Sequence, residues 1–558
     1  MLLDMIHDNH GEPAFRTRYR DPAVLAEYGF HALVIPEALA VLPSARPAAP
    51  GPGQRDAVAE RSTAIDSQVA QAAGQGLQVF FYVDALLLPR KLVHAARDRY
   101  LCDDGSGRLC PAKPAVYDAY AGLLAELLTR WPEAAGVVVR SGEVYPETAP
   151  HMVGSALHES SCPACRALGA VARLTGFIQR MHAVVAGEHH RLYVHRAWQK
   201  AGSGATLHED AALFRELAAG LPHDQRLLFS FKFTRGDFLA GQPANPCLVD
   251  PATAQRGKWI ELQCEREFEG KGAFPNFQPV LWCDFLRSTG LGGALLERQA
   301  HPETAPAALD LWGWSRGGGW GGPYVPREDW IDANVFGLAE LARNPLATPE
   351  QIARAWASRT FGVEPTSRVA QSIVELLLIS PRAIERLLYE PAASARGHEA
   401  GRISWVRDDQ LDVDALWASA ARLPDGPAIA AACREKLAGL EDVEQMRQLF
   451  ERIGLELPNQ AQARDLANML IFYNSFAGAV AHLYCGAART LEWQRGGRHD
   501  AALAQQAADH LENAQGYWQH NTQRHAMLPG APSVFEETSF WERTNDCLEE
   551  LAGAHSSA

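Results

Sequence analysis

The sequence has 558 residues, of which 47% are hydrophobic and 21% are charged, and its formal net charge is −14. This composition is ordinary for a folded globular protein with room for two or three domains, and it excludes a fibre or a disordered chain. The negative net charge argues against a nucleic-acid partner, because such a surface needs clustered lysines and arginines.

Targeting signals and cysteine usage predict the compartment. The N-terminus shows no basic segment, long apolar stretch or small-residue cleavage site of a secretion signal. No run of about 18 or more apolar residues occurs, so we expect no membrane partner. Ten scattered cysteines fit a reducing compartment, and the expected location is the cytoplasm.

Short β-rich runs alternate with helical patterns from residue 1 to about residue 340. This alternation is typical of a parallel sheet with crossover helices. The eighth run is the least certain, because ALDLWGW nearby could replace it. The eight runs are LLDMIH, HALVIPE, LQVFFYV, GVVVRSGE, RLYVHRAW, RLLFSFKF, KWIELQCE and GGALLERQ. They predict an α/β fold, a (β/α)8 TIM barrel, that spans residues 1–345.

Apolar residues at three- and four-residue spacing predict the helices between these strands. The segments are 56–73, 116–130, 166–185 and 207–219. Beyond about Thr348 the pattern is helical almost throughout, which predicts an all-α C-terminal domain over residues 346–558. Its function cannot be inferred from this pattern.

Two strand ends carry candidate substrate contacts, since reactive groups in such barrels sit at the C-terminal ends of strands. Glu143 closes the fourth strand behind small neighbours, and the alternative is that it merely pairs with Arg140. Arg196 at the end of the fifth strand offers a planar fork to a carboxylate, and the alternative is a structural salt bridge. Trp198 offers an apolar face that suits a sugar ring.

The sixth and seventh strands add a cation and further carboxylates. Lys232 closes the sixth strand, and Asp237 follows in a turn. The seventh strand, KWIELQCERE, carries Glu261, Glu265 and Glu267, which lie on one face if the strand continues. We expect Glu267 at the strand exit to meet substrate and Glu261 to lie inside the barrel.

These segments resemble the α-glucuronidases of glycoside hydrolase family 67. The matching segments are VHRAW, FKFTRGDF with Pro243 and Pro246 behind it, and ELQCEREFEG, in the same order and at similar spacing. A later segment, DWIDANVFGLAELARNPLATPEQIARAWASRTFG, is similar to the one that joins the family's barrel to its helical domain. The sequence begins at the barrel, without the N-terminal β-domain of full-length members, so selectivity for a 4-O-methyl group stays open.

The resemblance implies a role for each residue. Glu143 would be the general acid, Asp237 and Glu267 would share the activation of water, and Arg196 with Lys232 would bind the uronate carboxylate. An inverting hydrolase holds its acid and base about 6.5–9.5 Å apart to leave room for water. Which of Asp237 and Glu267 is the base stays open.

The predicted function is an exo-acting, inverting, α-glucuronidase-like glycoside hydrolase that releases a uronic acid from small acidic oligosaccharides such as xylan fragments. Two alternatives stay open: a glycosidase of different sugar specificity on the same barrel, and a non-catalytic carbohydrate-binding barrel. No cofactor is expected. The helical region could form a homodimer, as it does in similar enzymes.

Two further groups are candidates by position or spacing. Trp314, in the segment LWGWSRGGGWGGPY with Trp312 and Trp320, could stack on sugars at the barrel mouth, or it could be packed structure. Asp8 at the end of the first strand could bind sugar hydroxyls. A weaker candidate is a four-thiolate zinc site, with free thiols as the alternative. Its ligands would be Cys102, Cys110, Cys162 and Cys165.

Overall fold

Eight parallel strands form the core of the N-terminal part of the chain. The computed structural model describes residues 2–4, 17–36, 38–46, 54–144, 151–159, 162–199, 206–302, 307–316, 325–394, 404–407 and 410–555. The strands pair in the order β1-β10-β9-β8-β7-β5-β3-β2, and β1 also pairs with β2. Their bounds are β1 (Leu2–Asp4), β2 (Ala32–Pro36), β3 (Gln78–Asp84), β5 (Ala134–Gly142), β7 (Leu192–Gln199), β8 (Leu227–Lys232), β9 (Gly257–Gln263) and β10 (Leu309–Arg316).

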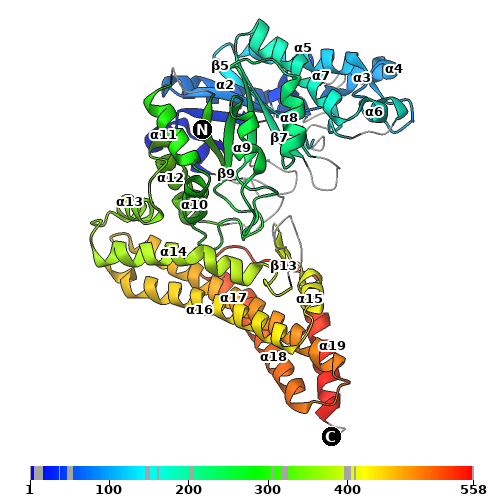
Figure 1. Ribbon diagram of the computed structural model, residues 1–558. Helices are drawn as coiled ribbons and strands as arrows, with labels where there is room; N and C mark the ends of the chain where they lie inside the picture. Colours follow the sequence, from blue (N-terminus) through cyan, green and yellow to red (C-terminus); the bar gives the residue numbers. More distant parts are fainter. Residues whose placement is uncertain are drawn as a thin grey trace.

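Helices cover the outside of this curled sheet, so the fold is α/β and barrel-like (Figure 1). The strands are buried on both faces because side chains fill the interior and helices pack outside. The longer covering helices are α1 (Pro22–Tyr28), α2 (Gln54–Gly74), α5 (Pro114–Arg130), α7 (Ala170–His182), α8 (Ala211–Ala219), α10 (Pro279–Ser288), α11 (Leu291–Ala300) and α12 (Asp329–Arg343).

The prediction of GGALLERQ as the eighth strand is wrong, and the alternative, ALDLWGW, is confirmed. GGALLERQ, residues 292–299, lies in helix α11, where Leu295 is buried while Glu297 and Gln299 are exposed. The eighth strand is β10, which contains the alternative segment ALDLWGW from Leu309 onward. The predicted helix 166–185 is interrupted at Gly169, whose positive φ separates α6 (Pro163–Leu168) from α7.

Two excursions leave the barrel after β3 and β5. Each carries a short strand, β4 (Leu87–Pro89) and β6 (Met152–Gly154), and these two strands pair antiparallel. The first excursion also carries the short helices α3 (Arg90–Ala95) and α4 (Arg97–Tyr100), and the second carries α6. The loops after β8 and β9 run toward the C-terminal helices instead, and the first of these loops includes α9 (Pro246–Val249) (Figure 1).

The C-terminal part is a stack of helices with one small sheet. The helices are α13 (Pro349–Phe361), α14 (Arg368–Leu388), α15 (Val413–Ala421), α16 (Gly426–Ile453), α17 (Gln460–Arg495), α18 (Ala501–Gln523) and α19 (Phe540–His555). The expectation of an all-α region is wrong in one detail, because three two-residue strands, β11 (Val406–Arg407), β12 (Gln410–Leu411) and β13 (Glu536–Glu537), form a sheet. Their brevity leaves no alternation to detect.

Helix α17 is the centre of the helical stack. It packs against α16 and α18, and most of its residues are buried. By length and composition alone it is the one helix in the described ranges that could cross a membrane, but 72% of its apolar window is buried inside the protein. A buried core helix has this same composition.

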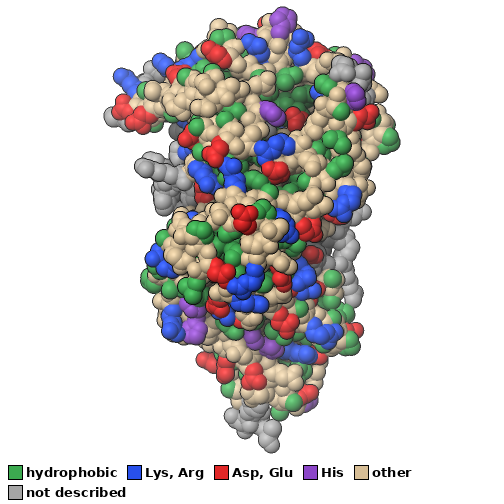
Figure 2. Space-filling model, turned by 90° about the vertical axis from the view of Figure 1, so that its left-hand side faces the viewer, with side chains coloured by type: hydrophobic (Ala, Val, Ile, Leu, Met, Phe, Trp, Pro, Cys, Tyr) green, Lys and Arg blue, Asp and Glu red, His purple; other side chains and the backbone are tan. Residues whose placement is uncertain are grey.

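On the face shown in Figure 2, positive and negative side chains are interspersed.

Asp332 joins the start of the chain to the helices that follow the barrel. Its buried carboxylate accepts hydrogen bonds from Tyr19 (2.7 Å), Tyr28 (2.5 Å) and the indole of Trp356 (2.8 Å), and it forms an ion pair with Arg18. These partners come from η1 (Arg18–Arg20), α1 and α13, so one carboxylate connects four elements.

We expect Asp332→Ala to lower the free energy of unfolding by about 3–5 kcal/mol, because it leaves three buried donors without an acceptor and removes the ion-pair partner of Arg18. Asp118→Ala is the control, since Asp118 forms an exposed pair with Arg180 and such pairs contribute about 0–1 kcal/mol. Urea unfolding followed by circular dichroism measures both. Equal midpoints for the two variants would contradict the role of Asp332.

Candidate functional site

An ion pair between Arg196 and Glu261 forms the floor of the candidate site. Arg196 on β7 donates from Nε and Nη2 to the two carboxylate oxygens of Glu261 on β9, at 2.8 and 2.5 Å. Ser230 on the intervening β8 is small enough to let these side chains meet, and its hydroxyl lies 3.4 Å from Glu261. Tyr82 accepts from Arg196 at 3.1 Å, and the indole of Trp314 donates to Glu261 at 2.7 Å.

Both members of this pair are ionised. Burial disfavours the charge on each, but the partner's charge outweighs burial, so the pKa of Glu261 is lowered and the pKa of Arg196 is raised. Arg196 is 3% exposed, and its fork is occupied by Glu261. The structure therefore shows the salt bridge that was the alternative for Arg196, with Glu261 inside the barrel as expected.

A second set of charges lies at the ends of β3 and β5. Arg140 on β5 donates to both oxygens of Asp84 at the end of β3, each at 2.7 Å, and to Glu143 at 2.7 Å. The side chains of Asp84 and Glu143 are 17% and 15% exposed, whereas that of Arg140 is 3% exposed. The two carboxylates therefore reach toward solvent above a buried cation, and Glu143 does pair with Arg140.

The third set combines Lys232, Asp237 and aromatic rings. Lys232 forms an ion pair with Asp237, and its Nζ lies 3.2 Å from the ring centre of Trp198 and 4.5 Å from that of Phe238. The backbone N–H of Phe238 donates to Asp237 at 2.8 Å. Burial opposes the charge of Asp237, but Lys232 and this N–H outweigh it, so the pKa of Asp237 lies below its usual value.

Glu267 lies in the loop after β9 and not on the strand. Strand β9 ends at Gln263, so the predicted alternation does not extend to Glu265 and Glu267. Glu265 lies 3.0 Å from Arg316, which also contacts Glu328 at 3.0 Å. In this loop Glu267 lies at the end of the barrel that carries the other carboxylates. It is largely covered, since only 8% of it is exposed.

The helical region holds the loops that carry Asp237 and Glu267. The hydroxyl of Tyr389, directly after α14, accepts from the N–H of Ala240 at 2.9 Å and donates to Glu269. Ser404 donates to the carbonyl of Phe268 at 2.9 Å. Phe274 stacks on Tyr473 of α17, with ring centres 4.2 Å apart. One tyrosine hydroxyl thus connects the loop after β8 to the loop after β9.

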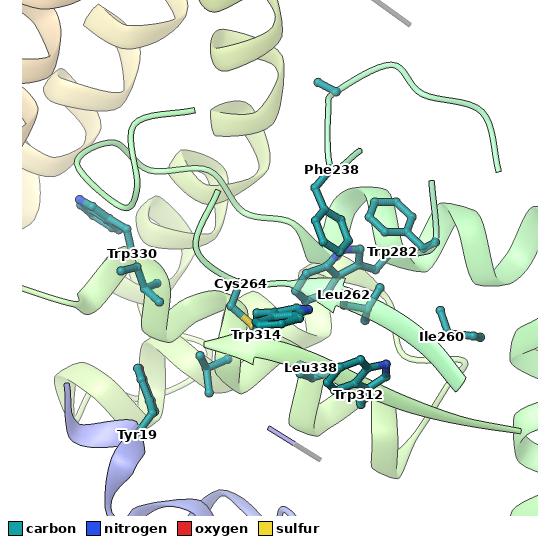
Figure 3. Close-up of a cluster of buried hydrophobic side chains, with 14 of the residues drawn as sticks. Tyr19, Phe238, Ile260, Leu262, Cys264, Trp282, Trp312, Trp314, Trp330 and Leu338 are labelled. Carbon is teal, nitrogen blue, oxygen red and sulfur yellow. The ribbon is translucent and has the colours of Figure 1, made fainter. Parts of the chain in front are cut away.

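The other predicted residues divide into three groups. Trp314 lies in strand β10 and is 3% exposed within the apolar cluster of Figure 3, so it is packed structure and no sugar platform at the mouth. Trp312 is likewise buried, with its indole 2.7 Å from the hydroxyl of Ser230. Asp8 and Trp320 lie outside the described residues. The four candidate cysteines lie together in the excursions after β3 and β5.

The sequence interpretation missed Asp84 and Tyr389. Asp84 ends the apolar run QVFFYVD, so the rule that located Glu143, a polar residue that closes a strand, would have located it too. Tyr389 carries no such signal, because its partners lie 149 and 120 positions earlier.

A surface pocket of about 620 Å³ lies beside the loop after β8. Its lining includes Thr206, Asp210, Arg235 and Pro243, and none of the predicted catalytic carboxylates lines it. The backbone N–H of Arg235 donates to the carbonyl of Pro243 at 2.9 Å, which closes the base of that loop. The pocket is thus on the outer side of the loop that carries Asp237.

Comparisons with known proteins find glycoside hydrolases that are similar to part of the sequence and to the fold. No protein-family profile matches the sequence. A segment of 169 residues, 29% of the chain, is 28% identical to an α-glucuronidase of Hypocrea jecorina, of which it covers 19%. Over this segment the chain is similar to a glycoside hydrolase. A solved structure of a GH138 enzyme targeting pectin rhamnogalacturonan II matches 96% of the chain at a TM-score of 0.56 and 12% identity.

The two relationships differ in what they establish. The chain spans 62% of the GH138 structure, and at 12% identity the likeness shows a shared fold alone. The chain also matches the structure of CpGH84B, but a TM-score of 0.40 does not establish a shared fold. The sequence match to the α-glucuronidase covers a small part of both proteins, so it supports a glycoside hydrolase-like relationship without fixing the sugar.

We expect Tyr389→Phe to lower the free energy of unfolding by about 1.5–3 kcal/mol, because a hydrogen bond to the Glu269 carboxylate is lost. Hydrogen exchange should become faster around Ala240 and Glu269 while the barrel strands stay protected. Tyr473→Phe is the matched control, since the buried hydroxyl of Tyr473 has no hydrogen-bond partner among the described residues. Unchanged exchange in both loops would rule out the connecting role of Tyr389.

Proposed function

We propose that the chain is an exo-acting, inverting, α-glucuronidase-like hydrolase on a (β/α)8 barrel, which releases a uronic acid from small acidic oligosaccharides. The observation that carries the proposal is the Lys232–Asp237 pair beside Trp198 at the exit of β8. It combines a cation, an ionised carboxylate and an aromatic face at the barrel end where substrates bind. The sequence match to an α-glucuronidase supports the same activity.

The carboxylates divide into an acid and a base. Glu143 follows β5 behind Gly142 and is 15% exposed, a position from which it could protonate a leaving oxygen. Asp237 is ionised at neutral pH, as a base that activates water must be. Glu267, in the neighbouring loop, would help to orient the same water. In an inverting mechanism no covalent intermediate forms.

The proposed uronate contact is Lys232 rather than Arg196. A lysine ammonium has three N–H donors, and the ion pair with Asp237 needs one of them. Arg196 is committed to Glu261, so it acts on the substrate through its charge and not through contact. This assignment changes the expectation that both cations grip the carboxylate, because the structure gives Arg196 a partner inside the barrel.

A glycosidase of different sugar specificity is the second candidate. The observation that favours it is the occupied fork of Arg196, since a neutral sugar has no use for a bidentate cation. The interior pair would then be a purely structural feature. A carbohydrate-binding barrel without catalysis would use Trp198 and Lys232 but would tolerate replacement of Glu143.

A panel of α-linked uronosides and matched neutral glycosides tests the proposed function. We expect release of the uronic acid from the uronosides, with kcat/KM about 10- to 150-fold above that for the neutral sugars, because a charge contact contributes about 1.5–3 kcal/mol. Proton NMR of the first product should show the β-anomer, as inversion requires. Hydrolysis of neutral glycosides alone would transfer the assignment to the second candidate.

Replacement of Glu143 tests the acid. We expect Glu143→Gln to lower kcat about 10²–10⁴-fold on a natural uronoside, because the leaving oxygen then receives no proton. An aryl uronoside with an acidic phenol as leaving group should be affected much less, since it needs no protonation. Glu159→Gln is the control, because Glu159 is a half-buried glutamate in the same excursion that pairs with Arg108. Equal losses on both substrates would contradict the role of Glu143 as acid.

Replacement of Lys232 tests the base and the uronate contact together. Without Lys232, burial is no longer outweighed, so the pKa of Asp237 rises. A base must be ionised, so the acidic limb of the kcat/KM profile should move to higher pH in Lys232→Met, and KM should rise for uronosides only. Lys258→Met, another buried lysine, should leave this limb in place. An unmoved acidic limb in Lys232→Met would exclude Asp237 as the base.

A further inference from the structure

A cluster of four cysteine sulfurs lies between the two excursions, apart from the carboxylates. Cys102 and Cys110 face each other across a hairpin. The N–H of Cys102 donates to the carbonyl of Arg108 at 2.9 Å, and the N–H of Cys110 donates to the carbonyl of Tyr100 at 2.8 Å. Cys162 and Cys165 come from the first turn of α6 in the other excursion. All four are buried and together form a cluster separate from the main core.

The sulfur positions form a compact set in which no disulfide is present. Cys102 and Cys165 are 4.0 Å apart, Cys110 and Cys162 are 3.6 Å apart, and Cys162 and Cys165 are 3.5 Å apart. All four ligand atoms lie within 4.8 Å of one another. A disulfide would need about 2.05 Å. A tetrahedral zinc ion with Zn–S bonds of about 2.3 Å holds its sulfurs about 3.8 Å apart, which matches.

The backbone around the sulfurs has the form of two facing knuckles. The N–H of Cys165 donates to the sulfur of Cys162 at 3.4 Å, so the CxxC turn presents both sulfurs to one point. Opposite it, the hairpin turns through Gly105 and Gly107, whose positive φ values of 75° and 72° suit glycine. The two knuckles supply two sulfurs each, from segments 52 to 63 positions apart.

We propose that Cys102, Cys110, Cys162 and Cys165 bind one structural zinc ion as four thiolates. Four protein ligands fill a tetrahedral shell and leave no position for water or substrate, so the site is structural and not catalytic. Four buried thiolates need a compensating cation, and thiolate donors in a tetrahedral arrangement favour zinc among the common divalent ions.

The zinc ion would fix the two excursions that begin at Asp84 and Glu143. They already meet through the β4–β6 pair, through the N–H of Leu109, which donates to the hydroxyl of Ser155 at 3.0 Å, and through the N–H of Arg90, which donates to the carbonyl of His151 at 2.9 Å. A metal ion bound by the four cysteines would add a cross-link between the excursions to these contacts.

Metal analysis of the full-length protein, purified with reducing agent and without chelator, tests the proposal. We expect about one zinc ion per chain, released by a thiol-reactive mercurial together with the four thiols. Cobalt(II) introduced after zinc removal should give the thiolate-to-metal charge-transfer band and the strong visible bands of a tetrahedral tetrathiolate site. Stoichiometric iron in place of zinc, absence of bound metal, or disulfides between these cysteines under reducing conditions would each overturn it.

A variant pair assigns the metal to these residues. We expect the zinc content per chain to fall about tenfold or more in the double variant Cys110→Ser and Cys165→Ser, since one ligand is removed from each knuckle. Cys283→Ser is the matched control, because Cys283 is a buried free thiol on α10 outside the cluster. If the double variant does not fold, the cobalt spectrum of the unaltered protein still decides the outcome. Full zinc content in a folded double variant would overturn the assignment.

Discussion

The buried pair of Arg196 and Glu261 is the interaction on which the barrel interior depends. It spans from β7 to β9 across Ser230, and Tyr82 and Trp314 complete its hydrogen bonds. Loss of either charge would leave the other buried without a partner, at a cost of about 3–5 kcal/mol. This ion pair therefore helps to fix the register of the neighbouring strands, and it does so without a bound substrate. This fixed layer is the floor above which Asp84, Glu143 and Asp237 are placed.

The outer carboxylates Glu143 and Asp237 are more exposed than the cations beside them. The side chains of Arg196, Arg140 and Lys232 are 3–5% exposed, whereas those of Glu143 and Asp237 are 15% and 23% exposed. The cations thus lie beneath these carboxylates, and Lys232 lowers the pKa of Asp237. Under the proposed function, a uronate that binds Lys232 would compete with Asp237 for the ammonium group.

The parts of the site that follow from local pattern could be predicted from the sequence, and the parts that follow from long-range pairing could not. Strand ends, and with them Glu143, Lys232 and Asp237, are visible as polar residues after apolar runs. The partner of Arg196 lies 65 positions away on a strand that is not its neighbour, and only the register of three strands brings Glu261 to it. The buried position of Trp314 could not be predicted either, because its indole donates to Glu261. Strand β10 was harder to predict than the others, because the helix before it is also apolar.

The boundary between barrel and helices, clear in the sequence pattern, separates elements that depend on one another. The contacts from Tyr389 to Ala240 and Glu269, from Ser380 to Phe277 and from Ser404 to Phe268 span 103 to 149 positions. They all end on the loops after β8 and β9, while the excursions after β3 and β5 have no comparable support from the helices among the described residues. The helical region therefore stabilises the half of the site that contains Asp237 and Glu267. The half that contains Asp84 and Glu143 needs a different constraint, and the clustered sulfurs of Cys102, Cys110, Cys162 and Cys165 lie where a metal ion would provide it.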